Sequence, residues 1–153
     1  TSFNIIDGNL QTTGAAPGIV HAEASNQDWS TNPAQGGFHI LEDLTLTITV
    51  SQPSVLLLTT NGHIVNNSGT QSALYASFFV DGIEANSPSN TINSDSGRFH
   101  IYNDAFTNWM PFSFTQMHPV NPGTHTVDLR TYVSVGTSWQ INGAGIEALA
   151  INR

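Results

Sequence analysis

The residues of this chain that could do acid–base or metal chemistry are six histidines and eleven carboxylates. No histidine has another histidine two or four positions away, and the H-E-x-x-H pattern of zinc proteases is missing. Ligands could still converge from distant strands, but jelly-roll metal sites usually begin from a local His-x-His pair. We therefore expect no metal and no cofactor.

The carboxylates also lack a catalytic arrangement. Glycoside hydrolysis needs two carboxylates facing each other across a groove, whereas most acids here lie near predicted turns, where Asp hydrogen-bonds its own backbone. Glu147 differs, because it is a lone carboxylate in an otherwise apolar segment. A buried charge needs a partner, so we expect Glu147 to pair with an arginine, such as Arg130, in this chain or a neighbouring copy. The G-x-S-x-G pattern of serine hydrolases is missing too, and we expect no enzyme.

Three tryptophans are the remaining candidates for ligand binding. Trp29, Trp109 and Trp139 could form a platform that stacks on sugar rings. Aromatic side chains also anchor protein interfaces, and singly they most often fill a core. Packing between subunits accounts for them better than sugar binding, which stays open as the alternative.

Composition excludes several partners. The 153 residues predict one domain, and only three of them are basic, against a formal net charge of −8. Nucleic-acid binding relies on Lys and Arg at the phosphates, so we expect no nucleic-acid partner. The longest aliphatic run, residues 55–58, is far shorter than the ~18 residues of a membrane span, so we expect no membrane insertion.

Several segments alternate with the period of a half-buried strand. Residues 44–50 alternate Leu, Ile or Val with Thr, and residues 74–80 and 112–115 follow the same period. Asn61-Gly62 and Asp81-Gly82 predict hairpin turns, and residues 118–123 predict a rigid two-proline connection. With no helical period visible, the pattern predicts an all-β antiparallel sandwich, jelly roll or barrel.

The C-terminal segment raises the question of assembly. Ile146, Ala148 and Ala150 fall on one face of a predicted strand, and Glu147, Leu149 and Ile151 fall on the other. A strand with apolar residues on both faces is either central in a sandwich or pressed against another subunit. Under the second interpretation, a subunit interface would contain the following residues: Ile146, Ala148, Leu149, Ile151, Tyr132, Glu147 and Arg130.

Three segments carry a family resemblance: residues 76–82, which end in Asp-Gly, residues 121–127, which begin Asn-Pro-Gly, and the last strand, 146–151. Over residues 38–151 the chain resembles bacterial and phage members of the tumour-necrosis-factor-like jelly-roll group. The resemblance implies a two-sheet, antiparallel jelly-roll sandwich that trimerises about its inner sheet. It transfers no catalytic residues.

The implied roles are capsid decoration, head fibre and tail-tip knob, on a virion surface or otherwise outside the cell. Residues 18–153 would form the jelly-roll domain, and residues 1–17, outside the resemblance, would form an N-terminal docking arm. The expected partners are two further copies in a homotrimer, other virion proteins bound through the arm, and a host-surface glycan as an additional ligand. A jelly-roll carbohydrate-binding module or lectin is the alternative function.

Overall fold

The computed structural model describes residues 3–6, 9–12, 20–26, 37–66, 72–85, 98–103, 106–133 and 139–152. Within these ranges no helix is long and apolar enough to cross a membrane. The described residues form these strands: β1 Phe3–Ile6, β2 Asn9–Thr12, β3 Val20–Asn26, β4 His39–Val50, β5 Ser54–Asn66, β6 Ser72–Val80, β7 Ile83–Glu84, β8 Phe99–Asn103, β9 Phe106–Val120, β10 Gly123–Val133 and β11 Trp139–Asn152.

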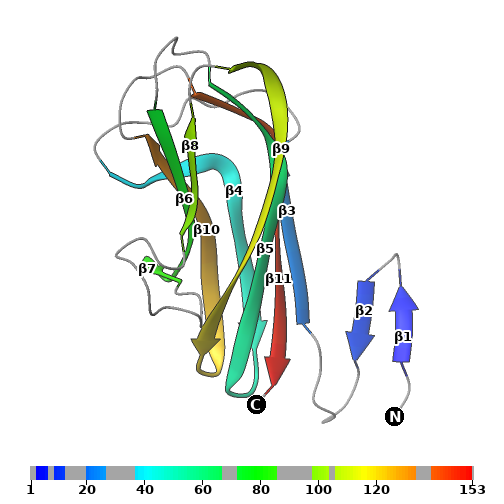
Figure 1. The fold of residues 1–153 in the computed structure, drawn as a ribbon. Helices are drawn as coiled ribbons and strands as arrows, with labels where there is room; N and C mark the ends of the chain where they lie inside the picture. Colours follow the sequence, from blue (N-terminus) through cyan, green and yellow to red (C-terminus); the bar gives the residue numbers. More distant parts are fainter. Residues whose placement is uncertain are drawn as a thin grey trace.

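Two antiparallel sheets face each other and form the body of the molecule (Figure 1). The β11 sheet has the strand order β3-β11-β5-β9, and the β10 sheet has the order β4-β10-β6-β7, with β8 also paired to β6. The chain crosses between the sheets from β3 through β4 and β5 to β6, and again from β8 through β9 and β10 to β11. This connectivity is a jelly roll, so the predicted all-β sandwich is confirmed. β1 and β2 pair only with each other among the described strands.

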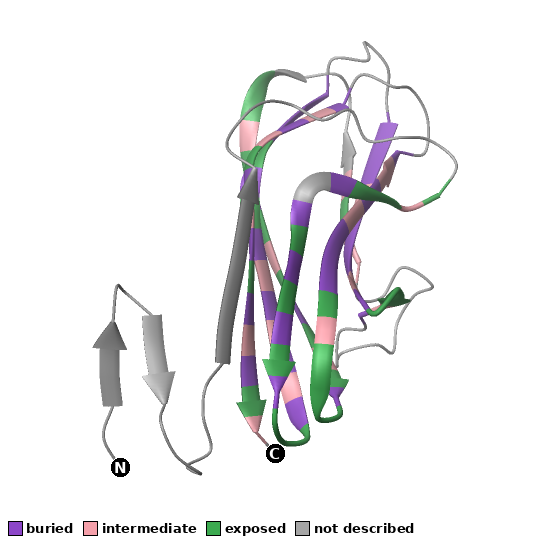
Figure 2. Cartoon of the chain, turned by 180° about the vertical axis from the view of Figure 1, so that it is seen from behind, coloured by how far each residue is buried: buried purple, intermediate pink, exposed green. Residues whose placement is uncertain are grey.

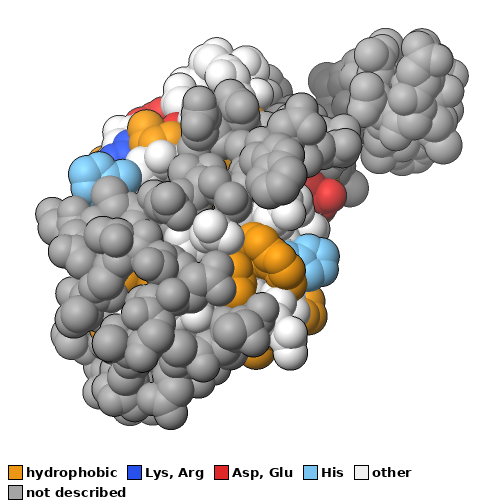
Figure 3. Space-filling model, turned by 90° about the horizontal axis from the view of Figure 1, so that it is seen from above, with side chains coloured by type: hydrophobic (Ala, Val, Ile, Leu, Met, Phe, Trp, Pro, Cys, Tyr) orange, Lys and Arg blue, Asp and Glu red, His pale blue; other side chains and the backbone are white. Residues whose placement is uncertain are grey.

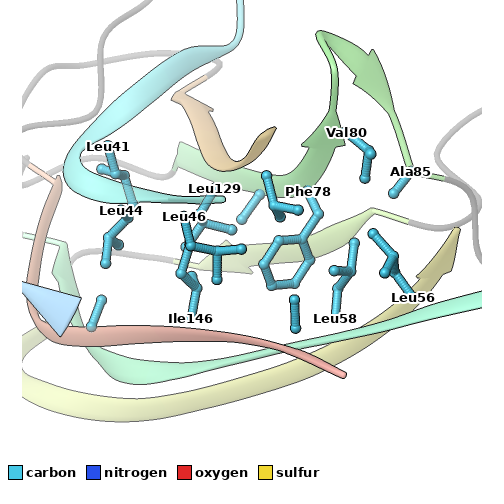
Figure 4. Close-up of a cluster of buried hydrophobic side chains, with 14 of the residues drawn as sticks. Leu41, Leu44, Leu46, Leu56, Leu58, Phe78, Val80, Ala85, Leu129 and Ile146 are labelled. Carbon is cyan, nitrogen blue, oxygen red and sulfur yellow. The ribbon is translucent and has the colours of Figure 1, made fainter. Parts of the chain in front are cut away.

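Alternating side chains from both sheets fill the space between them. Along β4 the Leu, Ile and Val of residues 44–50 are buried and the intervening Thr are exposed, as predicted (Figure 2). Phe78 of β6 lies between Leu46 and Leu58, which come from opposite sheets (Figure 4). Burial of these apolar surfaces, at about 25 cal/mol per Å², is the main stabilising contribution.

One predicted hairpin is present and the other is wrong. Val80 pairs with Ile83 across Asp81-Gly82, and both turn residues have positive φ (52° and 81°), as a type I′ turn requires. Asn61-Gly62 instead lies inside β5, which continues to Asn66. A Cβ on Gly62 would approach Phe112 Cε1 to 2.8 Å and Ala144 Cα to 3.0 Å. This glycine therefore permits a close approach of strands and makes no turn.

The predicted two-proline connection is also shorter than expected. Residues 118–120 belong to β9, which pairs with β5 as far as Ser54↔Val120. Only Asn121 and Pro122 separate β9 from β10. The β4–β5 turn, the β9–β10 turn and the C-terminus of β11 lie together at the lower end of the molecule in Figure 1.

Candidate assembly surface

The last strand, β11, is central in its sheet, between β3 and β5. Ile146 and Ala148 lie in the core of their own subunit, 1 % and 0 % exposed. These two members of the predicted interface are therefore enclosed within the sandwich and do not reach its surface. The opposite face of β11 carries Glu147, which is exposed, Leu149, which is half-buried, and Ile151, which is 46 % exposed.

Strand register extends this apolar outer face across three strands. Ile151 is opposite Val55, and Val55 is opposite Pro119. In the next outward-facing row, Leu149, Leu57 and Met117 are aligned in the same way. Cross-strand neighbours have Cβ atoms about 4.5–5.5 Å apart, so the rows are contiguous. We call these six residues the outer apolar patch: Val55, Leu57, Met117, Pro119, Leu149 and Ile151.

Polar residues bound the outer apolar patch on the side away from the C-terminus. The next row contains Glu147, Thr59 and Thr115, and Thr59 Oγ1 donates a hydrogen bond of 3.5 Å to a Glu147 carboxylate oxygen. The following row contains Asn61 and Ser113, both exposed. A compact apolar area with a polar border, which here includes the exposed Glu147 carboxylate, matches the apolar core and polar rim of a protein interface.

The edge beside the outer apolar patch disfavours strand addition. β9 is the outermost strand on this side of the β11 sheet, and it contains Pro111 and Pro119. Proline has no N–H and, within sheets, occurs on edge strands where its nitrogen faces away from the ladder. Proline on an edge strand therefore disfavours backbone hydrogen bonding to a strand of another chain. Strand addition along β9 is therefore disfavoured.

The other two members of the predicted interface lie on the opposite side of the sandwich. Arg130 and Tyr132 belong to β10, on the outer face of the β10 sheet. An Arg130 guanidinium nitrogen lies 2.8 Å from an Asp128 carboxylate oxygen, and its Cζ lies 4.3 Å from the centroid of Phe79. Pairing of Glu147 with Arg130 within one subunit is thus wrong, because the two side chains emerge from different sheets.

Tyr132 belongs to a row of stacked rings. It stacks on Tyr75 with centroids 4.5 Å apart, and Tyr75 stacks on His100 at 4.6 Å, with interplanar angles of 4° and 9°. The residues are opposite one another in β10, β6 and β8. Because the rings cover each other's faces, this row leaves little flat aromatic surface for a sugar.

The three tryptophans do not form the proposed platform. Trp139 is fully buried, and its Nε1 donates a hydrogen bond of 3.0 Å to Ser72 Oγ. Trp109, on β9, is 42 % exposed. Trp29 lies outside the described residues. The structure thus leaves Trp109 as the described tryptophan with an exposed indole.

The residues of the described ranges form no candidate metal centre. Those residues contain no group of three or more His, Cys, Asp or Glu side chains that could hold a metal ion. Figure 3 views the molecule from the end opposite the C-terminus. The described side chains visible there show no continuous surface of one charge.

Sequence reasoning missed four residues of the outer apolar patch. Val55 and Leu57 belong to the aliphatic run 55–58, which has no polar residue to mark an outward face, and Met117 and Pro119 alternate with the inward-facing Gln116 and His118. The period-two alternation of residues 112–120 was an available signal for the outward position of Met117. This alternation does not reveal which other strand lies beside the strand that contains Met117.

No protein-family model and no curated protein matches the chain. Distant structural similarity links it to other β-sandwiches. The EclA C-terminal domain, a sugar-binding protein, is 16% identical over 90% of this chain and 83% of that one, with a TM-score of 0.42. Eiger TNF from S. frugiperda is 8% identical over 87% and 91% of the two chains, at 0.47. A chain of the IBDV viral particle is 9% identical over 100% and 39%, at 0.46.

Proposed function

We propose that this protein is a non-enzymatic, homotrimeric structural or attachment protein of a virus or phage particle, in the role of capsid decoration, head fibre or tail-tip knob. The observation that carries the proposal is the outer apolar patch, which lies on the open face of the β11 sheet. The trimeric state and the virion setting are supported by the resemblance of residues 38–151 to tumour-necrosis-factor-like knobs.

The outer apolar patch gives assembly a physical basis. Burial of its six side chains against sister copies would contribute about 25 cal/mol per Å² of apolar surface. That gain must exceed an association cost of roughly 4–15 kcal/mol. The polar rows on one side of the patch contain Thr, Asn and Ser together with the exposed carboxylate of Glu147, which would have to stay solvated at the rim of the interface.

The same geometry leaves the β10 sheet available for outward contacts. Its outer face is opposite the outer apolar patch, so three copies meeting through their β11 sheets would point their β10 sheets away from the symmetry axis. Three weak outward contacts then act together, and the linked binding sites gain avidity. Under this proposal residues 1–17 form the docking arm that contacts other virion proteins.

The molecular mass in solution tests the proposal. Sedimentation of the full chain at micromolar concentration should give three times the 16.4 kDa chain mass. Leu149→Glu and Met117→Glu each place a charge in the outer apolar patch and should shift the mass toward one chain. Thr47→Glu, at an exposed position of β4 in the other sheet, is the matched control and should keep the wild-type mass. A wild-type monomer at tens of micromolar would contradict the proposal.

Trp109 supports a second candidate function, that of a carbohydrate-binding module or lectin. Its 42 % exposed indole lies on β9 and could stack on a pyranose ring. A glycan array with the wild-type chain and the Trp109→Ala variant tests this function. Binding that is lost in the variant would favour the lectin function, whereas an array without binding would remove it.

A further inference from the structure

A histidine of β10 connects the β6–β7 turn with the β9–β10 turn, which lies at the lower end of the molecule in Figure 1. His125 Nδ1 lies 2.7 Å from Asp81 Oδ2, in the β6–β7 turn, and Nε2 lies 2.8 Å from the backbone oxygen of Asn121, in the β9–β10 turn. Two hydrogen bonds join Asp81 to Thr126 of β10. Thr126 N donates to Asp81 Oδ1 at 2.9 Å, and Asp81 N donates to Thr126 O at 2.9 Å.

The two partners of His125 determine its protonation state. A carboxylate oxygen and a carbonyl oxygen are both acceptors, whereas a neutral imidazole has a single N–H to donate. Only the imidazolium form donates to both at once. Deprotonation would leave one ring nitrogen facing an acceptor without a hydrogen between them, so the geometry favours the charged form.

His118 approaches the same end of the core from the other sheet. It lies on the inward-facing side of β9, between Gln116 and Val120 in the alternation, and it is half-buried. Burial lowers the pKa of His118, and the charge of His125 lowers it further, while Asp81 opposes both. In contrast to His125, this histidine is favoured in its neutral form.

We propose that His125 and His118 form a pH-sensing pair near the β9–β10 turn of the sandwich. This end of the sandwich is most stable while His125 is charged and His118 is neutral. The titratable group hydrogen-bonded to His125 is Asp81 from the β6–β7 turn, and the charge of His125 lowers the pKa of His118 on β9. Ile48 lies opposite His125 in β4, and its neighbours Thr47 and Thr49 do not titrate.

The two histidines give pH dependences of opposite sign. Burial disfavours charge on His125, but the hydrogen bonds to Asp81 and Asn121 outweigh it and raise its pKa above 6.5. Its contribution to stability is complete below pH 6.5 and is lost as the pH rises through the raised value. The pKa of His118 is lowered from 6.5, so its contribution is complete above pH 6.5 and is lost as the pH falls. The two contributions together are largest near pH 6.5.

Asp81 adds a separate dependence at lower pH. The hydrogen bond from His125 lowers the pKa of Asp81 below 3.8, with a smaller opposing effect of burial. Its contribution is therefore complete above pH 3.8 and is lost as the pH falls through the lowered value. This range lies apart from the range in which the histidines titrate, so the two effects can be separated.

Two measurements on the full chain test the pair. In ¹⁵N spectra both ring nitrogens of His125 should carry protons at pH 6.5, and the His125 titration midpoint should exceed that of His118. The free energy of unfolding, measured with urea from pH 5 to 8.5, should fall on both sides of pH 6.5. His125→Gln should remove the alkaline fall, and His118→Gln should remove the acid fall. Asp81→Asn should lower the His125 midpoint and reduce the alkaline fall.

His63→Gln is the matched control, because His63 is exposed in β5, away from the β9–β10 turn. This variant should reproduce the wild-type pH profile. A His125 that is neutral at pH 6.5, or an unfolding profile unchanged by His125→Gln and His118→Gln, would overturn the proposal. Every contact involved lies within one subunit, so the result does not depend on whether the protein trimerises.

Discussion

Thr60 and Thr131 are both 1 % exposed, but their hydroxyl groups have different surroundings. Thr60 Oγ1 donates a hydrogen bond of 2.8 Å to the carbonyl of Gly145, across the β5–β11 pair. Thr131 Oγ1 has no hydrogen-bond partner in the part of the chain that the structure describes. A buried hydroxyl without a partner is destabilising, whereas a satisfied one is close to neutral or favourable.

Replacement of each threonine by the similarly shaped valine should therefore change stability in opposite directions. Thr131→Val should raise the free energy of unfolding by about 1 kcal/mol, because it removes an unsatisfied polar group. Thr60→Val should lower the free energy by about 1–3 kcal/mol, because it leaves the Gly145 carbonyl without its donor. Urea denaturation at one fixed pH measures both. A loss of stability in Thr131→Val as large as in Thr60→Val would show that the Thr131 hydroxyl has a partner.

At the residue scale the sequence predicts the strand face on which a side chain lies better than it predicts the residue with which that side chain pairs. Alternation correctly placed Ile146 and Ala148 on one side of β11 and Leu149 and Ile151 on the other. The expected pairing of Glu147 with Arg130 is wrong within the subunit, because Arg130 lies opposite Ile40 and Ser77 in another sheet. Period-two patterning is a local property of a strand, whereas ion pairing depends on which strands face each other.

At the scale of the strand, an Asn-Gly and an Asp-Gly dipeptide that both favour hairpin turns have different structures. Asp81-Gly82 reverses the chain between β6 and β7, and Asn61-Gly62 continues β5. The difference arises from what surrounds Gly62, which is a shift of register in β11 between Asn142 and Gly145 and the ring of Phe112. Local preference predicted the first turn, but tertiary packing overrides it in β5.

Gly62→Ala tests this explanation. The added methyl group would meet backbone of β11 at 3.0 Å, which cannot move aside as a flexible side chain would. Overpacking of this kind should lower the free energy of unfolding by about 1–3 kcal/mol. The neighbouring exposed residue provides the control, and Asn61→Ala should change stability by less than about 0.5 kcal/mol. If the two variants unfold at the same urea concentration, the close approach at Gly62 is not a constraint.

At the scale of the whole molecule, the sequence predicted the sandwich but not the composition of its surfaces. The outer apolar patch combines residues 55–57, 117–119 and 149–151, and only the strand order β11-β5-β9 brings them together. Alternation can show that each segment has an outward apolar side chain. It contains no information on register between segments that are some thirty to ninety residues apart.

Net charge gives the proposed trimer a salt dependence of defined sign. Each chain has a formal charge of −8, so sister copies repel, while the outer apolar patch that would join them is uncharged. Salt shortens the screening length from about 30 Å at 0.01 M to about 3 Å at 1 M and should therefore strengthen association. Sedimentation at low and high NaCl should show a dissociation constant that falls severalfold as salt rises.

The matched variant for this effect is Glu147→Gln, because Glu147 is an exposed carboxylate in the row next to Leu149 and Leu57. Removal of this charge should tighten association at low salt, where repulsion between copies is greatest. At high salt the variant and the wild type should converge, because screening has already removed most of the repulsion. Dissociation of the wild-type assembly by salt would instead indicate an interface held by ion pairs, and such an interface would have to lie elsewhere on the molecule.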